Sequence, residues 1–237
     1  MYKRQAHGNA QIFKKYMHPY RNSHSYFYSP GPDTSTAGIL TVFKVGLINL
    51  CISPPSFTAV QAGRLGFVTF SLPDSSVIVW NVHNYDLQED SMHVAFSRIS
   101  QQTAAAKADP LKSALFLLGD FNLSRNNNRF YIDPLDHASY SSSPSLHTNN
   151  LTKIGKSWQT LFRALVEVAT QDFTHFSSEG GFETPIDRVF WSIPPWASRM
   201  MNIHRPAFLP AHSMHLNGLS DHTPAGFSLC CKSNSSN

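Results

Sequence analysis

The chain has 237 residues, of which 41% are hydrophobic and 14% charged, and its formal net charge at pH 7 is +4. This length and composition suit one sizeable α/β domain, and the modest positive charge permits a phosphate-rich partner without requiring one. No apolar run is long enough to span a membrane, and the polar, basic start is unlike a signal peptide. Neither a disulfide framework nor a zinc motif is formed by the three cysteines, Cys51, Cys230 and Cys231.

The chain is expected to form one domain with short appendages. Residues 1–5 look like a non-native leader and residues 233–237 are a polar tail, which leaves residues 6–232 for the domain. Residues 12–28 mix aromatic side chains with basic and histidine side chains, and the turn-forming residues 29–33 follow. We find no internal repeat and no composition change that indicates a second domain.

Strand-like and helical patterns alternate along this domain. Runs rich in β-branched and aromatic residues predict strands at residues 38–45, 57–61, 65–70 and 77–82. The middle two are expected to form a hairpin, and the last ends at His83. Residues 87–108 predict a helix whose apolar face carries Met92, Ala95, Phe96 and Ile99.

After the polar residues 126–150, which predict a long loop, helical spacing returns at Trp158, Leu161, Phe162, Leu165 and Ala169.

Three short motifs place polar residues beside apolar, strand-like runs. Gly119-Asp120-Phe121-Asn122 directly follows Leu115-Phe116-Leu117-Leu118, which is typical of a strand buried on both faces. Ile186-Asp187-Arg188 opens another apolar run, and Ser220-Asp221-His222 precedes the run from Ala225 to Leu229. Because α/β sheets present their chemistry where strands end, we expect these motifs to form one site.

The order of the three motifs resembles the endonuclease/exonuclease/phosphatase superfamily, which includes apurinic-site endonucleases and the endonuclease domains of LINE-type retrotransposons. The resemblance covers residues 6–229. It implies an α/β fold, namely a two-sheet sandwich flanked by helices in four layers, here missing its N-terminal strand or strands. It also implies cleavage of phosphate esters with Mg²⁺ or Mn²⁺. Within the superfamily, the Asn81-Val82-His83 strand and the Ile-Asp-Arg form favour a nucleic-acid endonuclease.

The resemblance implies a role for each polar residue of the motifs. The expected catalytic residues are Asp120, Asn122, Asp187 and His222; the expected phosphate contacts are His83 and Asn122; and the expected metal ligand is Asp221. The imidazole of His222 contacts the water or the phosphate, and a hydrogen bond to Asp187 would fix its tautomer. Asp120 serves as the second proton-transfer group, and Asn122 donates to a nonbridging oxygen.

The motif residues also have purely structural interpretations. Asp120 and Asn122 could form an Asx turn after a strand. His222 could cap a turn while Asp187 pairs with Arg188 at the surface. The ordered set of motifs favours the dyad of Asp187 and His222, and the buried strand before Asp120 favours a catalytic role for that residue.

For Asp221 and His83 the functional and structural interpretations are almost equally favoured. Asp221 could cap the turn before Pro224, and His83 could be a half-buried structural histidine. Two other signals are rejected. Gly155-Lys156-Ser157 imitates the end of a P-loop but lacks the upstream glycine, and His212-Ser213-Met214-His215 has ligand-like spacing but no cysteine or carboxylate partner nearby.

Gln5 stands where the resembled family has the glutamate that is its main metal ligand. A neutral amide cannot replace a carboxylate as the dominant ligand of a hard cation, so we expect weak or absent activity in this form. One alternative is a non-catalytic remnant that still binds phosphate or nucleic acid. Another is a lipid or inositol phosphate phosphatase of the same superfamily.

The expected partner is nucleic acid, with DNA favoured, and we expect a monomer that does not bind membranes. An intracellular location, in the nucleus or cytoplasm, agrees with the cysteine usage. It also agrees with Asn122-Leu123-Ser124, a formal glycosylation acceptor at which a sugar would block the expected site.

Overall fold

The computed structural model describes ten ranges of the chain: residues 10–32, 38–123, 130–132, 139–141, 152–168, 174–177, 182–184, 186–194, 201–204 and 228–231. These ranges contain every expected site residue that precedes the last motif, except Gln5. In this part of the chain, no helix combines the length and apolar character needed to cross a membrane.

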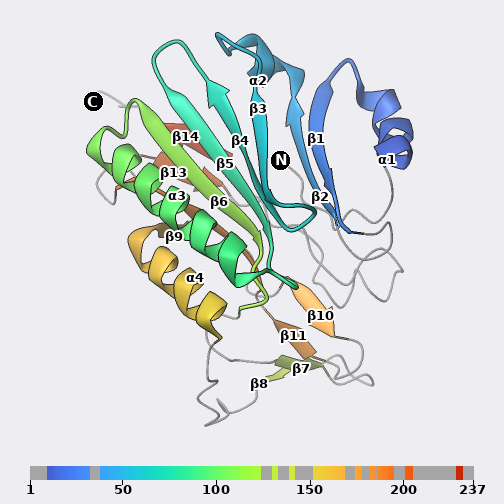
Figure 1. Ribbon diagram of the computed structural model, residues 1–237, viewed down its shortest axis with the longest axis vertical. Helices are drawn as coiled ribbons and strands as arrows, with labels where there is room; N and C mark the ends of the chain where they lie inside the picture. The colour runs from blue at the N-terminus through green and yellow to red at the C-terminus, as the bar shows by residue number, and fades with distance from the viewer. Residues whose placement is uncertain are drawn as a thin grey trace, which may run out of the picture.

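A six-stranded mixed sheet is the centre of the fold (Figure 1). In spatial order its strands are β3 (Ser56–Gln61), β4 (Leu65–Ser71), β5 (Ser76–His83), β6 (Ser113–Asp120), β12 (Asp187–Trp191) and β9 (Val166–Val168). β5 and β6 are parallel, and the other neighbouring pairs are antiparallel. β5 and β6 need a crossover connection because they are parallel, and the helix between them supplies it.

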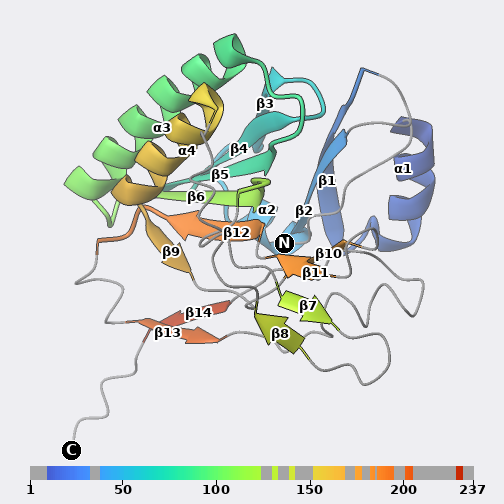
Figure 2. The same cartoon turned by 90° about the horizontal axis from the view of Figure 1, so that it is seen from below.

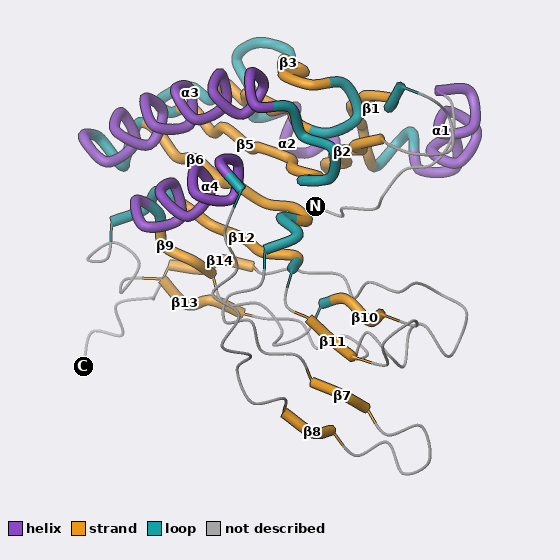
Figure 3. Tube along the Cα trace, turned by 60° about the horizontal axis from the view of Figure 1, so that its bottom comes forward, coloured by secondary structure: helices purple, strands orange, loops and turns teal. Residues whose placement is uncertain are grey.

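Two helices cover one face of this sheet, as Figure 3 shows. α3 (Glu89–Ala108) is the crossover, and α4 (Lys153–Ala164) lies beside it. The expected face of α3 is confirmed, because Met92, Ala95 and Ile99 are buried and Phe96 packs against the same core. α4 begins at an N-cap, where the Thr152 hydroxyl accepts a hydrogen bond from the Gly155 N–H at 3.1 Å.

The other face of the sheet is covered by a hairpin of β1 (His24–Pro30) and β2 (Gly38–Lys44), with the short α2 (Val45–Asn49) after it. Phe27 stacks on Phe57 of β3 at 5.6 Å, and Phe43 meets Phe70 of β4 edge-on at 5.2 Å. α1 (Ala10–Met17) lies on the outer side of β1, where Phe13 contacts Tyr28 (Figure 2). Helices, sheet, hairpin and helix therefore form four layers, as the sequence predicted.

Smaller elements complete the described part of the chain. A 3-10 helix, η1 (His18–Tyr20), follows α1. The remaining strands form a four-stranded sheet and a two-stranded sheet: β7 (Phe130–Ile132), β8 (Ser139–Ser141), β10 (His175–Ser177) and β11 (Phe182–Thr184) in the first, and β13 (Met201–His204) and β14 (Ser228–Cys231) in the second. In Figure 2, β13 and β14 lie on the side of the six-stranded sheet opposite α3 and α4.

Two sequence predictions were wrong in detail. Residues 126–150 are not only a loop, because they contain β7 and β8, and β7 also pairs with β11 from much later in the chain. The second helix does not continue to residue 169, because Leu165 is extended and Val166–Val168 pairs with β12 as β9. Pairing with a distant strand outweighs helical spacing in both segments, and three-residue strands carry little pattern of their own.

The predicted hairpin of residues 57–61 and 65–70 is confirmed, with β3 and β4 joined by a turn at residues 62–64. Gly155, the glycine of the false P-loop, is a buried residue of α4, which agrees with rejecting that motif. Cys51 is a free cysteine.

Candidate active site

Four polar side chains lie in one row where four neighbouring strands of the six-stranded sheet begin or end. His83 is the last residue of β5 and Asp120 the last of β6, and the two are partners in the parallel register. Asp187, the first residue of β12, is the antiparallel partner of Asp120. Arg64 directly precedes β4, and its carbonyl accepts a hydrogen bond from the His83 N–H at 2.7 Å. We call Arg64, His83, Asp120 and Asp187 the polar row.

The side chains of the row point to the same face of the sheet. Successive residues of a strand alternate between its two faces, so each row residue shares a face with the residue two positions away. Asn81, two before His83, donates from Nδ2 to the Leu40 carbonyl of β2 at 3.2 Å. Leu118 and Val189 pack together in a core on the same side. The row therefore faces the β1–β2 layer and not the helices, and all four of its members are buried.

Gly119 explains why a glycine precedes the first acid of the row. Its φ is +151°, and a Cβ built on it would lie 2.0 Å from the Val82 carbonyl oxygen of β5. Only glycine adopts such a backbone without strain and allows the neighbouring strand to come so close. This close approach places the end of β6 directly beside the end of β5, and so it places Asp120 beside His83.

The turn after β6 is held by its own side chains and by an aromatic anchor. One carboxylate oxygen of Asp120, Oδ1, accepts a hydrogen bond from the Asn122 N–H at 2.9 Å, so the Asx turn of the structural interpretation is present. Asn122 is left-handed, with φ +49°, and its Nδ2 donates to the Asn84 carbonyl at 3.1 Å. Phe121 is fully buried on the opposite face, where it meets the ring of Trp158 edge-on at 5.2 Å. The aromatic anchor thereby fixes the polar residues on either side of it.

Arg64 and His83 form a buried pair that the sequence did not reveal. Arg64 is only 3% exposed, and its Nη1 lies 3.1 Å from Nδ1 of His83. A guanidinium can only donate, so Nδ1 of His83 must accept, and Nε2 is then the nitrogen that carries the ring proton. The guanidinium also lies 5.1 Å from the ring centroid of Tyr85, a cation–π distance. The pair presents one fixed positive charge and one N–H donor, a combination suited to phosphate.

Asp187 does not pair with the next residue in the chain. Its N–H donates to the hydroxyl of the buried Thr174 at 2.8 Å. Arg188 instead forms a bidentate ion pair with Glu167 of β9, with Nε–Oε1 and Nη2–Oε2 distances of 2.9 and 3.0 Å. Its guanidinium also lies 4.5 Å from the ring centroid of Phe162. The surface pair of Asp187 with Arg188, which was the structural alternative, is therefore absent.

The last motif and the leader fall outside the described residues, and so do Asp221, His222 and Gln5. Within the described ranges, no group of three or more histidine, cysteine, aspartate or glutamate side chains could hold a metal ion. The carboxylates of Asp120 and Asp187 are the hard oxygen donors that Mg²⁺ and Mn²⁺ prefer. Two adjacent carboxylates fit part of such a site and would need a further ligand.

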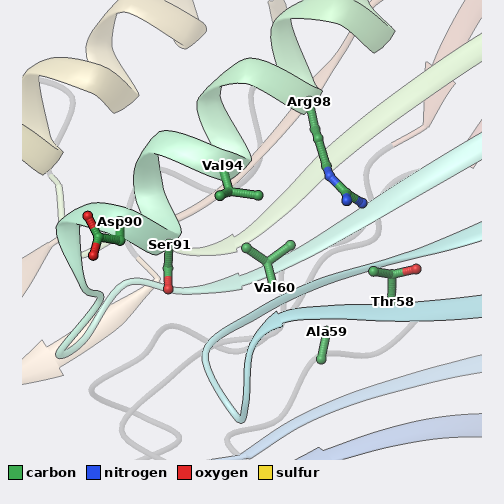
Figure 4. A pocket seen from close by; sticks show the side chains of 7 residues that line it. All are labelled: Thr58, Ala59, Val60, Asp90, Ser91, Val94 and Arg98. Atoms are coloured by element: carbon green, nitrogen blue, oxygen red, sulfur yellow. The ribbon is translucent and has the colours of Figure 1, made fainter.

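A separate surface pocket lies between the edge strand β3 and α3 (Figure 4). It has a volume of about 270 Å³ and is lined by Thr58, Ala59, Val60, Asp90, Ser91, Val94 and Arg98. None of these residues belongs to the polar row. The two charged residues in the lining have opposite signs, and the set lacks the paired acids and the histidine of the row.

Sequence analysis missed Arg64 and Thr174. Arg64 was assigned to a hairpin turn, where an arginine is normally solvated, and only the register of β4 with β5 places it beside His83. The sequence held one weak sign that Arg64 could be buried: it directly precedes a mainly apolar, strand-like run. Thr174 lies in a polar stretch with no pattern, and nothing in the sequence indicates its contact with Asp187.

Comparison with known proteins identifies the fold. No protein-family model and no curated protein matches the chain. Among solved structures, the chain is similar to the AP endonuclease LMAP from Leishmania major, with 12% identity, a TM-score of 0.54, and 96% of this chain and 86% of that chain covered. The 2',3'-cyclic phosphatase ANGEL2 gives 13% identity, a TM-score of 0.54, and coverages of 95% and 79%. An endonuclease/exonuclease/phosphatase family protein from Bacteroides thetaiotaomicron is 11% identical, with a TM-score of 0.51, and the match covers 94% of this chain and 82% of that chain.

At these identities the similarity establishes the fold alone. The chain has the endonuclease/exonuclease/phosphatase fold over nearly its whole length, as the three motifs predicted. The structural neighbours include an endonuclease and a phosphatase.

Proposed function

We propose that this chain, with its endonuclease/exonuclease/phosphatase fold, is a divalent-metal-dependent phosphodiesterase, and specifically a nucleic-acid endonuclease. The observation that carries the proposal is the polar row. A histidine and two acids at the ends of β5, β6 and β12 are register partners, and Arg64, just before β4, is hydrogen-bonded to this histidine. Burying four polar side chains at one place is costly for folding, and such clusters gather at functional sites, which supports a role in the reaction.

Hydrolysis of a phosphodiester needs an activated water, charge stabilisation at the phosphoryl group and a proton for the leaving oxygen. We assign charge stabilisation to Arg64 and to the Nε2–H of His83. Asp120 is assigned the proton transfer through Oδ2, because Oδ1 accepts the hydrogen bond of the turn. Asn122 has a second amide N–H besides the one that Asn84 accepts, and we assign this proton to a nonbridging oxygen.

The remaining roles belong to the dyad of Asp187 and His222. Asp187 is fixed at the start of β12 by its pairing with Asp120 and by the Thr174 hydroxyl. We assign Asp187 the task of orienting the imidazole of His222, which contacts the attacking water or the phosphate.

The metal ion, Mg²⁺ or Mn²⁺, would be held by Asp221, directly or through a water. It would supply Lewis-acid stabilisation of the phosphoryl oxygens. Gln5 offers only a neutral amide at the position where the resembled family has its main carboxylate ligand. We therefore propose that cleavage by this chain is weak, and that changing Gln5 to Glu strengthens it.

The decisive experiment measures nicking of supercoiled plasmid DNA by the chain and by its Gln5→Glu variant, with Mg²⁺, with Mn²⁺ and with EDTA. In the Gln5→Glu background, Arg64→Met and Asp120→Asn should each lower the nicking rate by at least about 100-fold, the size typical of losing a transition-state hydrogen bond or charge. Asp74→Asn is the matched control, since Asp74 is an exposed residue between β4 and β5. Equal rates for all variants would refute the role of the polar row.

Further measurements on the same variants separate the alternatives. Metal-independent binding of a labelled oligonucleotide, with no cleavage even by the Gln5→Glu variant, would favour a non-catalytic remnant. Release of phosphate from soluble inositol phosphates in preference to DNA nicking would favour a phosphatase of the same fold. Cleavage of RNA in preference to DNA would keep the reaction and change the substrate.

A further inference from the structure

The segment from α1 to the start of β1 exposes aromatic and basic side chains far beyond what its packing requires. α1 buries only Phe13, whose ring contacts Tyr28 of β1 at 4.4 Å. Tyr16 is 68% exposed and Tyr20 is 55% exposed. Large aromatic side chains normally bury most of their surface, so two exposed tyrosines four residues apart point to a binding role.

The exposed residues follow one another closely along the chain. Tyr16 lies in the last turn of α1, and Tyr20 ends η1, which follows α1 directly. Lys14 and Lys15 lie in α1, and His18 and Arg21 lie at the start of η1 and just after its end. The side chains of Arg21 and His18 are hydrogen-bonded to each other, which confirms that these two residues face the same way.

The charged side chains of the described residues 10–32 all have the same sign. Residues 10–32 contain Lys14, Lys15 and Arg21 and no aspartate or glutamate. Lys44 of β2 adds a further exposed cation at the same end of the hairpin, because it is the register partner of His24. We call Lys14, Lys15, Tyr16, Tyr20 and Arg21 the basic–aromatic strip. Without any acid among them to neutralise the cations, the strip is complementary to a polyanion.

The combination of cations with exposed rings selects one class of polyanion. Single-stranded nucleic acid offers phosphates to the cations and unstacked bases to the rings, whereas the bases of a duplex are already stacked. An anionic membrane would use the cations as well, but it would need a broad apolar face beside them. Beside these tyrosines α1 exposes only one large apolar side chain, Ile12. The chemistry therefore favours a single strand.

We propose that the basic–aromatic strip binds single-stranded DNA or RNA by stacking bases on Tyr16 and Tyr20 and pairing phosphates with Lys14, Lys15 and Arg21. The strip contains no member of the polar row, so it forms a docking surface additional to the site of hydrolysis. The inference rests on the proposed function only where it treats the bound strand as a substrate. Binding itself needs neither metal nor cleavage.

The test uses the full chain in EDTA, with fluorescence anisotropy of a labelled 12-nucleotide oligothymidine. The double variant Tyr16→Ala with Tyr20→Ala should weaken binding at least about tenfold, since each base–aromatic stack supplies a factor of that order. The conservative double variant Tyr16→Phe with Tyr20→Phe should bind like the parent chain because it keeps the rings.

The cations are tested by the salt dependence of the same affinity. Three phosphate contacts to a single strand predict a slope of about −2 for the logarithm of the binding constant against the logarithm of salt concentration. The triple variant that combines Lys14→Gln, Lys15→Gln and Arg21→Gln should lose most of this salt dependence. The matched control removes three exposed lysines of α3, its C-terminal turn and α4: Lys107→Gln, Lys112→Gln and Lys156→Gln.

The outcomes separate this inference from the proposed hydrolysis. Weaker oligothymidine binding in both the tyrosine and the cation variants, measured in EDTA, supports the strip whether or not the chain nicks plasmid DNA. Unchanged oligothymidine binding in both variants overturns the inference, even if nicking is strong. Tighter binding of phosphatidylserine vesicles than of oligothymidine, lost in the same variants, would also overturn it and identify a membrane surface.

Discussion

Gly119 is the residue whose replacement most directly tests how the site is built. We predict that Gly119→Ala destabilises the chain and displaces Asp120. The added methyl group would lie 2.0 Å from the Val82 carbonyl oxygen and 2.8 Å from its carbonyl carbon, whereas ordinary contacts begin near 3.4 Å. Both neighbours are backbone atoms, so β5 and β6 must move apart at the end that carries His83 and Asp120.

The cost follows from the geometry. Separating the strand ends by more than about 1 Å breaks the last one or two ladder hydrogen bonds, at about 1 kcal/mol each. A non-glycine residue at φ +151° adds about 1–3 kcal/mol of backbone strain. The free energy of unfolding should therefore fall by about 2–5 kcal/mol, which corresponds to a decrease in Tm of about 10 °C for a chain of this size.

Urea denaturation followed by tryptophan fluorescence measures this change, because Trp80, Trp158 and Trp191 are buried in the cores that the sheet separates. Gly46→Ala is the matched control. Gly46 is an exposed residue of α2 with nothing within 4 Å of an added Cβ, and alanine there should raise stability by about 0.5–1 kcal/mol. If Gly119→Ala and Gly46→Ala unfold within 1 kcal/mol of each other, the close approach of β5 and β6 is not what the glycine provides.

Three further predictions concern stability. Arg188→Met removes a bidentate, part-buried ion pair with Glu167 and should lower the free energy of unfolding by about 1.5–3 kcal/mol. Lys112→Met removes an exposed pair and should change it by less than about 1 kcal/mol, and a similar loss in both urea titrations would contradict this reasoning. Thr152→Ala removes the N-cap of α4 and should cost about 1 kcal/mol, measured as a shift of the urea midpoint, with Thr152→Ser retaining most of the stability. Burial raises the pKa of Tyr28 above its ordinary value of 10.0, so the folded state holds this proton more tightly than the unfolded state. The resulting stability is present below pH 10 and is lost as the pH rises through the raised pKa, and in urea titrations above pH 10 a Tyr28→Phe variant should lack this loss.

Much of the fold could be predicted because local patterns and tertiary structure agree. The apolar face of α3 and the β3–β4 hairpin follow from periodicity and turn chemistry, and the structure confirms both. The segments that were predicted wrongly are short or ambiguous. β9 begins two residues after the end of a strongly periodic helix, and only its pairing with β12 makes Val166–Val168 extended.

The candidate site could likewise be predicted only in part. The motifs showed the residue types and their positions beside strand ends, and from these we expected the residues to converge. The structure brings His83, Asp120 and Asp187 into register, whereas the roles of Asp221 and His222, which lie outside the described residues, remain proposals. The contact of Arg64 with His83 could not be predicted, because it depends on the pairing of two strands.

By itself, the sequence determined which chemistry the chain can present, because acids and an amide stand beside apolar, strand-like runs. Tertiary structure alone decided which of these groups face one another. The physical reason is that a strand fixes only the alternation of its own side chains, whereas the row across the sheet depends on how four strands are shifted relative to their neighbours. At Gly119 that shift is set by the absence of a single methyl group, which lets β6 lie against the backbone of β5.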